Sequence, residues 1–587
     1  MASAARGGRG LSERGVASDG VSLGLAEASW GRGLWAALGG ALGAAWRALR
    51  GLVGGGRGLS EGGAASAGAA RGLAEAGGGR GFWAALGGAA RRGLRGLVGA
   101  RGRRGLSEEG VASAGAARGL AEEDEVGVAS PQAALPLAGP ERGRVPQVSA
   151  FHLLHRGGAL HLERLARQCG PVLRMRMGGR EVLVLGAAGP IREALARNWG
   201  AWMGRPPSYL GSLVSLGGQD LALGAPCRAW RAQRGAARAA LSGPGLQGAL
   251  RSQAEALARE LRSYGGAPLD PFEVFSFHTC STIGRLLFGD LLPPEPEVRA
   301  FARCLVELLD VWGRTSVRAL DMCPALRVLP HPGLRQLQRL IQHRDSFVEK
   351  QLSRYRALHP EGSPLPPASP EVGGRPTALP PARLHMALVD LFLGGTETTA
   401  AALAWALALL AHRPELQARL RDELWRELGP SGTPEPGDTA RLPLLLATLN
   451  ETLRLRPPAP LALPHCALRH TSVAGVLVPT GSVLVPNLLA AHLDPSAWCR
   501  PRAFLPERFL LPDAPRRSLL PFGCGARSCV GAALARSELL VFLGRILWEF
   551  RIEPPAPGQL PGLEGTPGTV LRPAGCSLRL VPWHSPA

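Results

Sequence analysis

Apolar residues at helical and strand spacing fill the chain from about residue 135 to its end. In Glu415–Leu428, "ELQARLRDELWREL", they recur every three or four positions, which predicts an amphipathic helix. Short runs rich in valine and leucine, "EVLVLG" at 181–186 and "SVLVPN" at 482–487, predict strands. Helical stretches outnumber strand stretches, so we expect a mainly α fold with a minor β-sheet region.

A proline-free run from Arg383 to His412 predicts one long helix. Its centre, "GGTETT", is unfavourable for a helix, because each glycine costs about 1 kcal/mol relative to alanine and threonine is also a weak helix former. Helix propensity therefore does not explain the glycines and hydroxyls of this helix, and we expect them to serve another purpose. Proline-rich stretches at 358–381 and 430–437 predict surface loops.

Residues 1–134 follow a different pattern, rich in Gly, Ala and Arg. The sequences "RGLSERGVAS", "RGLSEGGAAS" and "RGLSEEGVAS" recur from Arg9, Arg57 and Arg104. Such a period can mark stacked structural units. So few large apolar side chains, however, bury too little surface to offset the entropy lost on ordering the chain. We predict a disordered or weakly helical repeat extension over 1–134 and one large globular domain over 135–587.

The extension offers no convincing membrane anchor or signal peptide. Its longest uncharged stretch, Gly33–Trp46, is shorter than the roughly 20 residues that cross a bilayer. Its arginines are typical of a transit peptide, but Glu13, Asp19 and Glu27 argue against one.

The chain is strongly basic, with 67 Lys and Arg against 46 Asp and Glu, a formal net charge of +21, and Lys350 is its single lysine. This balance suits an acidic partner such as nucleic acid, anionic lipid or an acidic protein. Residues 1–150 hold 18 Arg and 12 acidic residues, hence +6, which leaves +15 for the rest. Binding of nucleic acid or anionic membrane by residues 1–130 is the alternative function. Because few aromatic residues interleave the repeats, we expect no nucleic-acid partner.

The ten cysteines are dispersed and form no Cys-x-x-Cys pair, which is typical of a chain kept reduced, with thiols free to act as ligands. Cys529 is the most informative, because it follows a glycine-rich turn and precedes a helical pattern. The apolar positions of that pattern are Leu539, Phe542, Leu543, Ile546 and Leu547. A helix start favours a thiolate through its free N–H groups and positive dipole end.

Three glycines near Cys529, at 523, 525 and 531, would let the backbone turn tightly and approach a flat ligand closely. The plain alternative is a buried, inert cysteine in a turn. A zinc site would need further Cys or His ligands at suitable spacing, and Cys524 alone does not supply them.

The pattern Phe522-x-x-Gly525-x-Arg527-x-Cys529-x-Gly531 resembles the haem-binding loop of the cytochrome P450 family. The resemblance implies the fold of that family and haem b as cofactor, with the thiolate of Cys529 as the axial iron ligand. Phe522 and Arg527 would contact the haem. Electrons would come from NADPH through a reductase.

Further motifs carry the same resemblance. Glu451 and Arg454 in "NETLRLRPP" would alone be an ordinary i, i+3 ion pair. With Arg508 in "PERF" they are similar to the buried network that fixes the haem loop of the family. Haem-contacting positions of the family are matched by Trp230 and Arg234 in "APCRAWRAQR", His465 in "LALPHC" and Arg205 in "GRP".

The "GGTETT" stretch resembles the family's distal-helix motif. Gly394 and Gly395 would let the backbone pass close over the iron, and Glu397 and Thr398 match the acid–alcohol pair that supplies protons for oxygen activation. The alternative is a buried helix whose threonine hydroxyls bond back to their own carbonyls.

Longer stretches narrow the resemblance to microsomal members of the family that hydroxylate steroids: "HMALVDLFLGGTETT", "ARLPLLLATLNETLRLRPPAPLALPH", "VPNLLAAHLD" and "FGCGARSCVG". The implied reaction is hydroxylation of the 21-methyl of progesterone and 17-hydroxyprogesterone, in glucocorticoid and mineralocorticoid synthesis. Hydroxylation at the 17 position is the alternative.

Arg344 and Asp390 correspond to the pair that recognises the steroid 3-keto end, and Gly394 would lie beside the substrate. A guanidinium can donate to a ketone in a dry pocket while a nearby carboxylate holds it in place. The plain alternative is a surface arginine and a helix aspartate. The resemblance further implies NADPH–cytochrome P450 reductase as a partner. Acidic groups of the reductase would dock on the basic surface of this chain. It also implies a membrane surface and the cytosolic face of the endoplasmic reticulum.

Overall fold

The computed structural model describes residues 145–583, with gaps at 156, 178–179, 244, 360–370, 373–374, 377–378 and 567. The repeat extension predicted over 1–134, and the alternative function assigned to it, lie outside the described residues. So does most of the proline-rich stretch predicted as a loop at 358–381.

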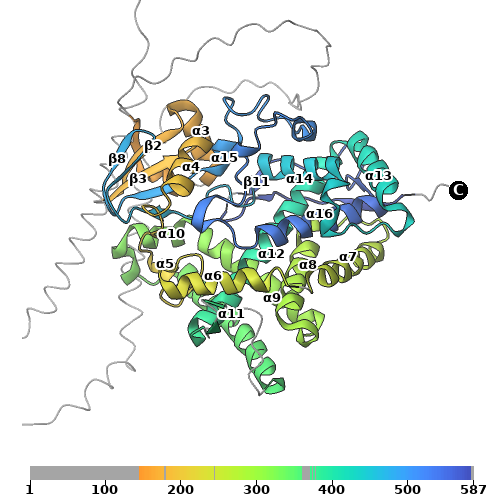
Figure 1. The fold of residues 1–587 in the computed structure, drawn as a ribbon, viewed down its shortest axis with the longest axis horizontal. Helices are drawn as coiled ribbons and strands as arrows, with labels where there is room; N and C mark the ends of the chain where they lie inside the picture. Colours follow the sequence, from red (N-terminus) through yellow and green to blue (C-terminus); the bar gives the residue numbers. More distant parts are fainter. Residues whose placement is uncertain are drawn as a thin grey trace, which may run out of the picture. The chain divides into compact units, whose positions relative to one another are not determined.

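Helices make up most of the described chain, and the predicted mainly α fold is confirmed (Figure 1). The α-helices are α3 (Gly158–Cys169), α4 (Ala188–Arg192), α5 (Tyr209–Val214), α6 (Arg228–Ala240), α7 (Leu246–Ser263), α8 (Pro271–Phe288), α9 (Glu295–Gly313), α10 (Thr315–Met322), α11 (Pro332–Leu358), α12 (Pro381–Ala411), α13 (Pro414–Leu428), α14 (Pro443–Leu455), α15 (Leu488–His492) and α16 (Ala532–Glu549).

Proline begins five of these helices, and this explains where several of them start. Its fixed φ suits the first helical position, where the missing N–H would have no partner within the helix. The five are α8, α11, α12, α13 and α14. The predicted helices at 415–428 and 383–412 are α13 and α12, each extended at its start to the preceding proline.

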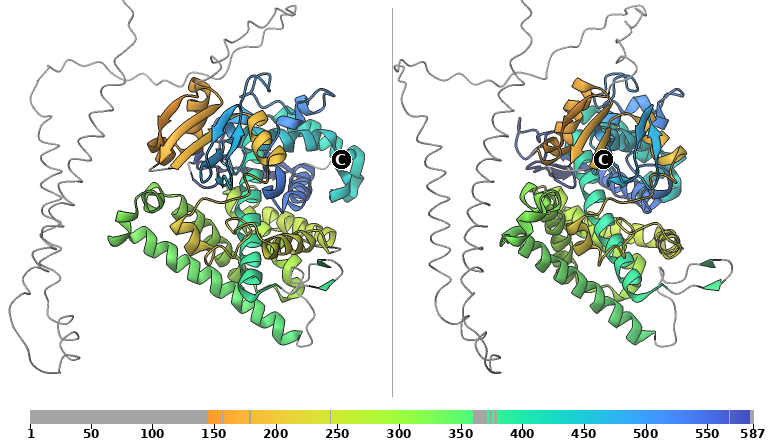
Figure 2. Two further views of the ribbon diagram at one scale, coloured as in Figure 1. Left: turned by 60° about the vertical axis from the view of Figure 1, so that its left-hand side comes forward. Right: turned by 90° about the vertical axis from the view of Figure 1, so that its left-hand side faces the viewer.

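The main sheet has five strands in the order β1-β2-β3-β9-β6 and lies beside the helical part (Figures 1 and 2). Its strands are β1 (Gln147–Ser149), β2 (Val172–Met177), β3 (Arg180–Leu185), β9 (Val483–Pro486) and β6 (His465–Cys466). β3 pairs in parallel with β9, with Val182 opposite Val483, so the two strands predicted from the sequence are neighbours.

Four two-stranded sheets complete the described β structure. They are β4 (Glu371–Val372) with β5 (Arg375–Pro376), β7 (Thr471–Val473) with β8 (Val476–Val478), β10 (Phe550–Glu553) with β13 (Arg579–Pro582), and β11 (Gly565–Thr566) with β12 (Arg572–Pro573). The hairpin β4–β5 belongs to the proline-rich stretch predicted as a loop. The second such stretch contains a 3-10 turn at Gly429–Ser431 and the start of another at Pro436–Ala440.

Helix α12 passes through the middle of the helical part (Figure 2) and packs against α8, α9, α14 and α16. Within the described ranges it is the one helix long and apolar enough to cross a bilayer, but 78% of its most apolar window is buried inside the protein. A helix that is apolar on all sides belongs in a core. The "GGTETT" motif is thereby held at the centre of the domain.

Candidate active site

The segment before α16 forms a tight loop that ends in Cys529. The carbonyl of Leu520 accepts the N–H of Gly523 at 2.9 Å, and the carbonyl of Phe522 accepts the N–H of Cys529 at 2.9 Å. Gly523 and Gly525 have φ of 67° and 75°, values that favour glycine. A Cβ on Gly525 would collide with the backbone carbonyl of Leu195. The loop therefore packs so closely against the backbone at Leu195 that only glycine fits at position 525.

The Cys529 side chain is open to solvent, while protein surrounds it on the remaining sides. Burial raises the pKa of the Cys529 thiol, and the opposing effects of the Gly531 backbone and the Arg234 charge are smaller. The expectation that the helix start favours a thiolate is thus wrong for the protein alone. The main reason is burial, which outweighs the favourable backbone hydrogen bond of Gly531, the N-cap residue of α16. A coordinating metal would deprotonate the thiol outright.

Three arginines converge beside this loop. The guanidinium of Arg527 donates to the carbonyls of Met203 and Gly224, and that of Arg205 donates to the carbonyls of Ala222 and Pro464, all at 2.7–2.9 Å. Arg234 donates to the carbonyl of Ser528, the residue before Cys529.

Trp230 and His465 complete this group, and both are buried. The Trp230 indole N–H donates to the carbonyl of Leu221 at 3.0 Å, and the Arg527 guanidinium lies 4.3 Å over its ring. His465 Nδ1 is 2.7 Å from the carbonyl oxygen of Trp202, to which it donates. The structure therefore brings together five residues predicted from separate segments, which we call the cationic cluster: Arg205, Trp230, Arg234, His465 and Arg527.

Positive charge is in excess in the cationic cluster. Burial and the neighbouring arginines lower the pKa of Arg205 to about 9 and that of His465 to about 3, and burial with Arg234 lowers that of Arg527 to about 10. Asp220, which is buried nearby, opposes the effect at Arg205 and Arg527. Buried cations without enough counter-charge favour an anionic ligand. Haem b fits, because it has two carboxylates and an iron that binds thiolate.

The centre of α12 presents Gly394 and Thr398 on its accessible side. A Cβ on Gly394 would meet open space, whereas one on Gly395 would press on the side chain of Ile283 in α8. The Thr398 hydroxyl donates to the Gly394 carbonyl at 2.6 Å, as the back-bonding alternative predicts. Its oxygen can still accept a hydrogen bond from that side.

Glu397 points the other way, into the protein, and only 1% of its surface is exposed. Its Oε2 has no hydrogen-bond partner among the described residues, and its Oε1 lies 3.7 Å from Nε of Arg572 in β12. Burial raises the pKa of Glu397 to about 8 against the effect of Arg572. Arg572 in turn pairs with Asp310 of α9 at 2.5 Å. The sequence analysis missed Arg572 and Asp310, because nothing local links positions 310, 397 and 572.

Arg344 in α11 is fully buried, but its partner differs from the expected one. Its Nε donates to Asp345 Oδ1 at 2.8 Å, and its Nη1 has no hydrogen-bond partner among the described residues. Asp390 instead accepts the N–H of Leu221 at 2.5 Å. Burial and nearby Asp220 raise the pKa of Asp390 well above its usual range, and the charge of Arg344 opposes them, so the predicted pair interacts electrostatically although no hydrogen bond joins these two described side chains. The carboxylate that holds Arg344 is therefore Asp345, which the sequence analysis missed although it is the next residue.

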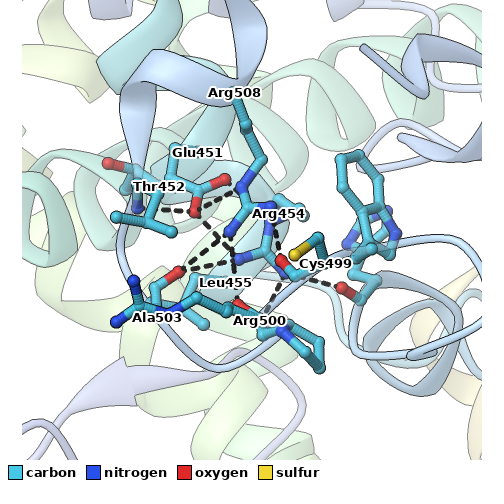
Figure 3. A network of polar contacts seen from close by, with 12 residues as sticks. Glu451, Thr452, Arg454, Leu455, Cys499, Arg500, Ala503 and Arg508 are labelled. Carbon is cyan, nitrogen blue, oxygen red and sulfur yellow. Dashed lines mark hydrogen bonds and ion pairs between the residues drawn. The ribbon is translucent and has the colours of Figure 1, made fainter. Parts of the chain in front are cut away.

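Glu451, Arg454 and Arg508 meet in one network (Figure 3). Arg454 binds both carboxylate oxygens of Glu451, at 2.7 and 2.9 Å, and both side chains are wholly buried. Arg508 reaches the same carboxylate at 3.1 Å. Remaining donors of Arg454 bind backbone carbonyls, among them that of His492 at 2.7 Å.

Comparison with known proteins finds sequence relatives and a similar fold. The sequence model of the family described as Cytochrome P450 matches residues 136–580. Relatives named Steroid 21-hydroxylase are 44% identical in Canis lupus familiaris, over 70% of this chain and 86% of the relative, and 39% identical in Homo sapiens, over 74% and 92%. A zebrafish cytochrome P450 structure with progesterone superposes with a TM-score of 0.65 at 30% identity, covering 72% of this chain and 99% of that one.

Proposed function

Because the chain belongs to the cytochrome P450 family, we propose that it is a haem-thiolate monooxygenase that hydroxylates the 21-methyl group of progesterone and 17-hydroxyprogesterone. The observation that carries the proposal is an accessible cysteine in a glycine-constrained loop beside the cationic cluster. The relatives named Steroid 21-hydroxylase and the related structure with progesterone support the choice of substrate.

Cys529 would bind the iron of haem b, and the cationic cluster would bind its carboxylates. Phe522, in the same loop, would lie against the haem. Haem supplies oxygen activation when it is bound, using electrons that we expect from NADPH through a reductase. The protein would hold the loop in place and neutralise the carboxylates.

Glu397 and Thr398 would supply protons on the distal side. A carboxyl with a pKa of about 8 holds its proton near neutral pH and can still release it. The Thr398 hydroxyl, on the accessible side of α12, would pass a proton toward oxygen when it turns from the Gly394 carbonyl to which it now donates. Because Glu397 faces inward, transfer between the two needs water or a side-chain rotation.

Thr398→Ala is expected to uncouple reductant use from product formation. The variant should still oxidise NADPH, while hydroxylated product falls by about a hundredfold, the lower end of the contribution of a positioned proton donor. Thr398→Ser, which keeps the hydroxyl, should remain coupled. Product and NADPH are measured in the same reaction, and full coupling in the alanine variant would exclude this role.

Arg344 would recognise the steroid 3-keto group through its unpaired Nη1. Arg344→Ala is expected to weaken steroid binding by about tenfold to a hundredfold, since a hydrogen bond from a charged group contributes roughly 1.5–3 kcal/mol. Arg335→Ala, at an exposed position of the same helix, is the matched control. Spectral titration with progesterone measures the affinity, and equal affinities in both variants would remove Arg344 from the site.

The setting of the enzyme is also proposed. We place it at the cytosolic face of the endoplasmic reticulum membrane, with NADPH–cytochrome P450 reductase as electron donor. We propose a catalytic domain over 135–587 and a separate repeat extension over 1–134.

Incubation of the full chain with progesterone, reductase and NADPH tests the reaction. The proposal predicts a 21-hydroxylated product, from 17-hydroxyprogesterone as well. A product hydroxylated at position 17 would favour the alternative specificity. Turnover of neither steroid by a haem-containing preparation would contradict the proposed substrate class.

A further inference from the structure

His492, the last residue of α15, is fully buried and joins two parts of the site. Its Nε2 accepts the backbone N–H of Leu520 at 2.8 Å. Its own carbonyl accepts a hydrogen bond from Nη1 of Arg454 at 2.7 Å. Through Arg454 the residue is connected to Glu451 and Arg508. One histidine thus contacts both the buried ion network and the chain that leads to Cys529.

The tautomer of His492 indicates that packing alone does not explain a histidine at this position. Because Nε2 accepts a hydrogen bond, the ring proton is on Nδ1, and Nδ1 has no partner among the described residues. A buried N–H without a partner destabilises a fold, so an apolar side chain of similar size would be the better core residue. Burial, with Arg454 adding to it, lowers the pKa of His492 to about 3, so the imidazole stays a neutral acceptor at working pH.

Leu520 is the point at which the Cys529 loop is fastened to the core. Its side chain packs in a buried cluster with Leu185, Trp202 and Leu488. Its carbonyl accepts the N–H of Gly523 and so starts the turn of the loop. His492 fixes the remaining backbone group, the N–H. Both polar backbone atoms and the side chain of Leu520 are therefore held.

We propose that His492 is a positioning residue for the Cys529 loop. It transmits the geometry of the Glu451–Arg454–Arg508 network to the loop through the Leu520 amide, and so sets where the Cys529 thiolate meets the iron. This inference rests on the proposed binding of haem through Cys529. It adds a residue outside the cationic cluster, one that would act through the Leu520 amide.

The test compares the wild-type holoenzyme with H492Q, H492L and H492M. Glutamine can place an amide oxygen near the position of Nε2, whereas leucine and methionine fill the space without a nitrogen or oxygen acceptor. We expect H492L and H492M to lose haem to apomyoglobin about tenfold faster than wild type, the lower end of the effect of residues that orient metal ligands. Their ferrous–CO complexes should lose much of the thiolate-type band. H492Q should behave like wild type in both measurements.

Hydrogen exchange at the Leu520 amide is a second measurement, and it does not depend on H492L or H492M. The Leu520 amide should be protected from exchange in wild type and in H492Q. If H492L and H492M do not fold, this protection alone tests the hydrogen bond to His492. An unprotected Leu520 amide in wild type would overturn the proposal, as would wild-type haem retention and band in H492L and H492M. A wild-type protein without the thiolate band would instead contradict the proposed function itself.

Discussion

Cys529→Ser is expected to abolish the ferrous–CO absorption band typical of thiolate-bound haem, and steroid hydroxylation with it. The serine hydroxyl keeps the size of the side chain but is far less easily deprotonated and is a poorer ligand for this iron. The accessible position of Cys529 means that the substitution removes no core packing. We therefore expect the fold to survive, with circular dichroism as the measurement.

Cys524→Ala is the matched control, because Cys524 lies in the same loop but packs against a hydrophobic cluster. It should keep the thiolate band. A band that survives in the Cys529 variant, or that disappears only in the Cys524 variant, would assign the iron to a different ligand.

Arg454→Ala is expected to destabilise the protein by about 3–5 kcal/mol, because removing one partner leaves Glu451 as a buried, unpaired charge. Both side chains are 0% exposed, so water cannot replace the lost partner. Backbone carbonyls that accept from Arg454, including that of His492, also lose their donor. Chemical denaturation measures the free energy of unfolding, and haem content shows whether the loop still binds.

Arg419→Ala is the control for this prediction. Arg419 pairs with Glu507 at 2.7 Å, a distance like that of the buried pair, but the two side chains are 51% and 43% exposed. Exposed pairs contribute only about 0.2–1 kcal/mol. Equal losses in the two variants would mean that burial does not decide the effect.

Elements with a strong local pattern could be predicted from the sequence. Strands β3 and β9 are short apolar runs that can be recognised as strands from their own residues. Helix α12 is a long apolar stretch with no proline after its first position. The starts of helices α12 and α13 were predicted less accurately, because a proline at the first helical position lies just outside the apolar pattern. The pairing of β3 with β9 could not be predicted from either run. The paired residues, such as Val182 and Val483, lie far apart in the sequence, and neither run contains information about the other.

The candidate site was found through motifs rather than through geometry. The resemblance pointed to Glu451, Arg454 and Arg508, and the structure adds that all three meet at one carboxylate. No motif pointed to Arg572 or Asp310, and His492 received no role although it lies in the quoted stretch "VPNLLAAHLD". Their contacts depend on the tertiary arrangement of helices and short strands, which a pattern along the chain does not encode.

The Cys529 thiol shows where a local rule failed. A helix start was expected to favour the thiolate, but the residue precedes the capping glycine, and surrounding protein penalises the charge more. The charge state of an ionisable group depends on everything packed around it. The resemblance had named each residue of the cationic cluster, and the structure adds that burial and neighbouring arginines lower the pKa of Arg205 and Arg527.

X-ray absorption at the iron edge of the purified wild-type protein tests most directly whether Cys529 binds the iron. We predict one sulfur ligand beside the porphyrin nitrogens in wild type, and its loss in Cys529→Ser. An iron surrounded by nitrogen and oxygen alone in the wild-type protein would contradict the account.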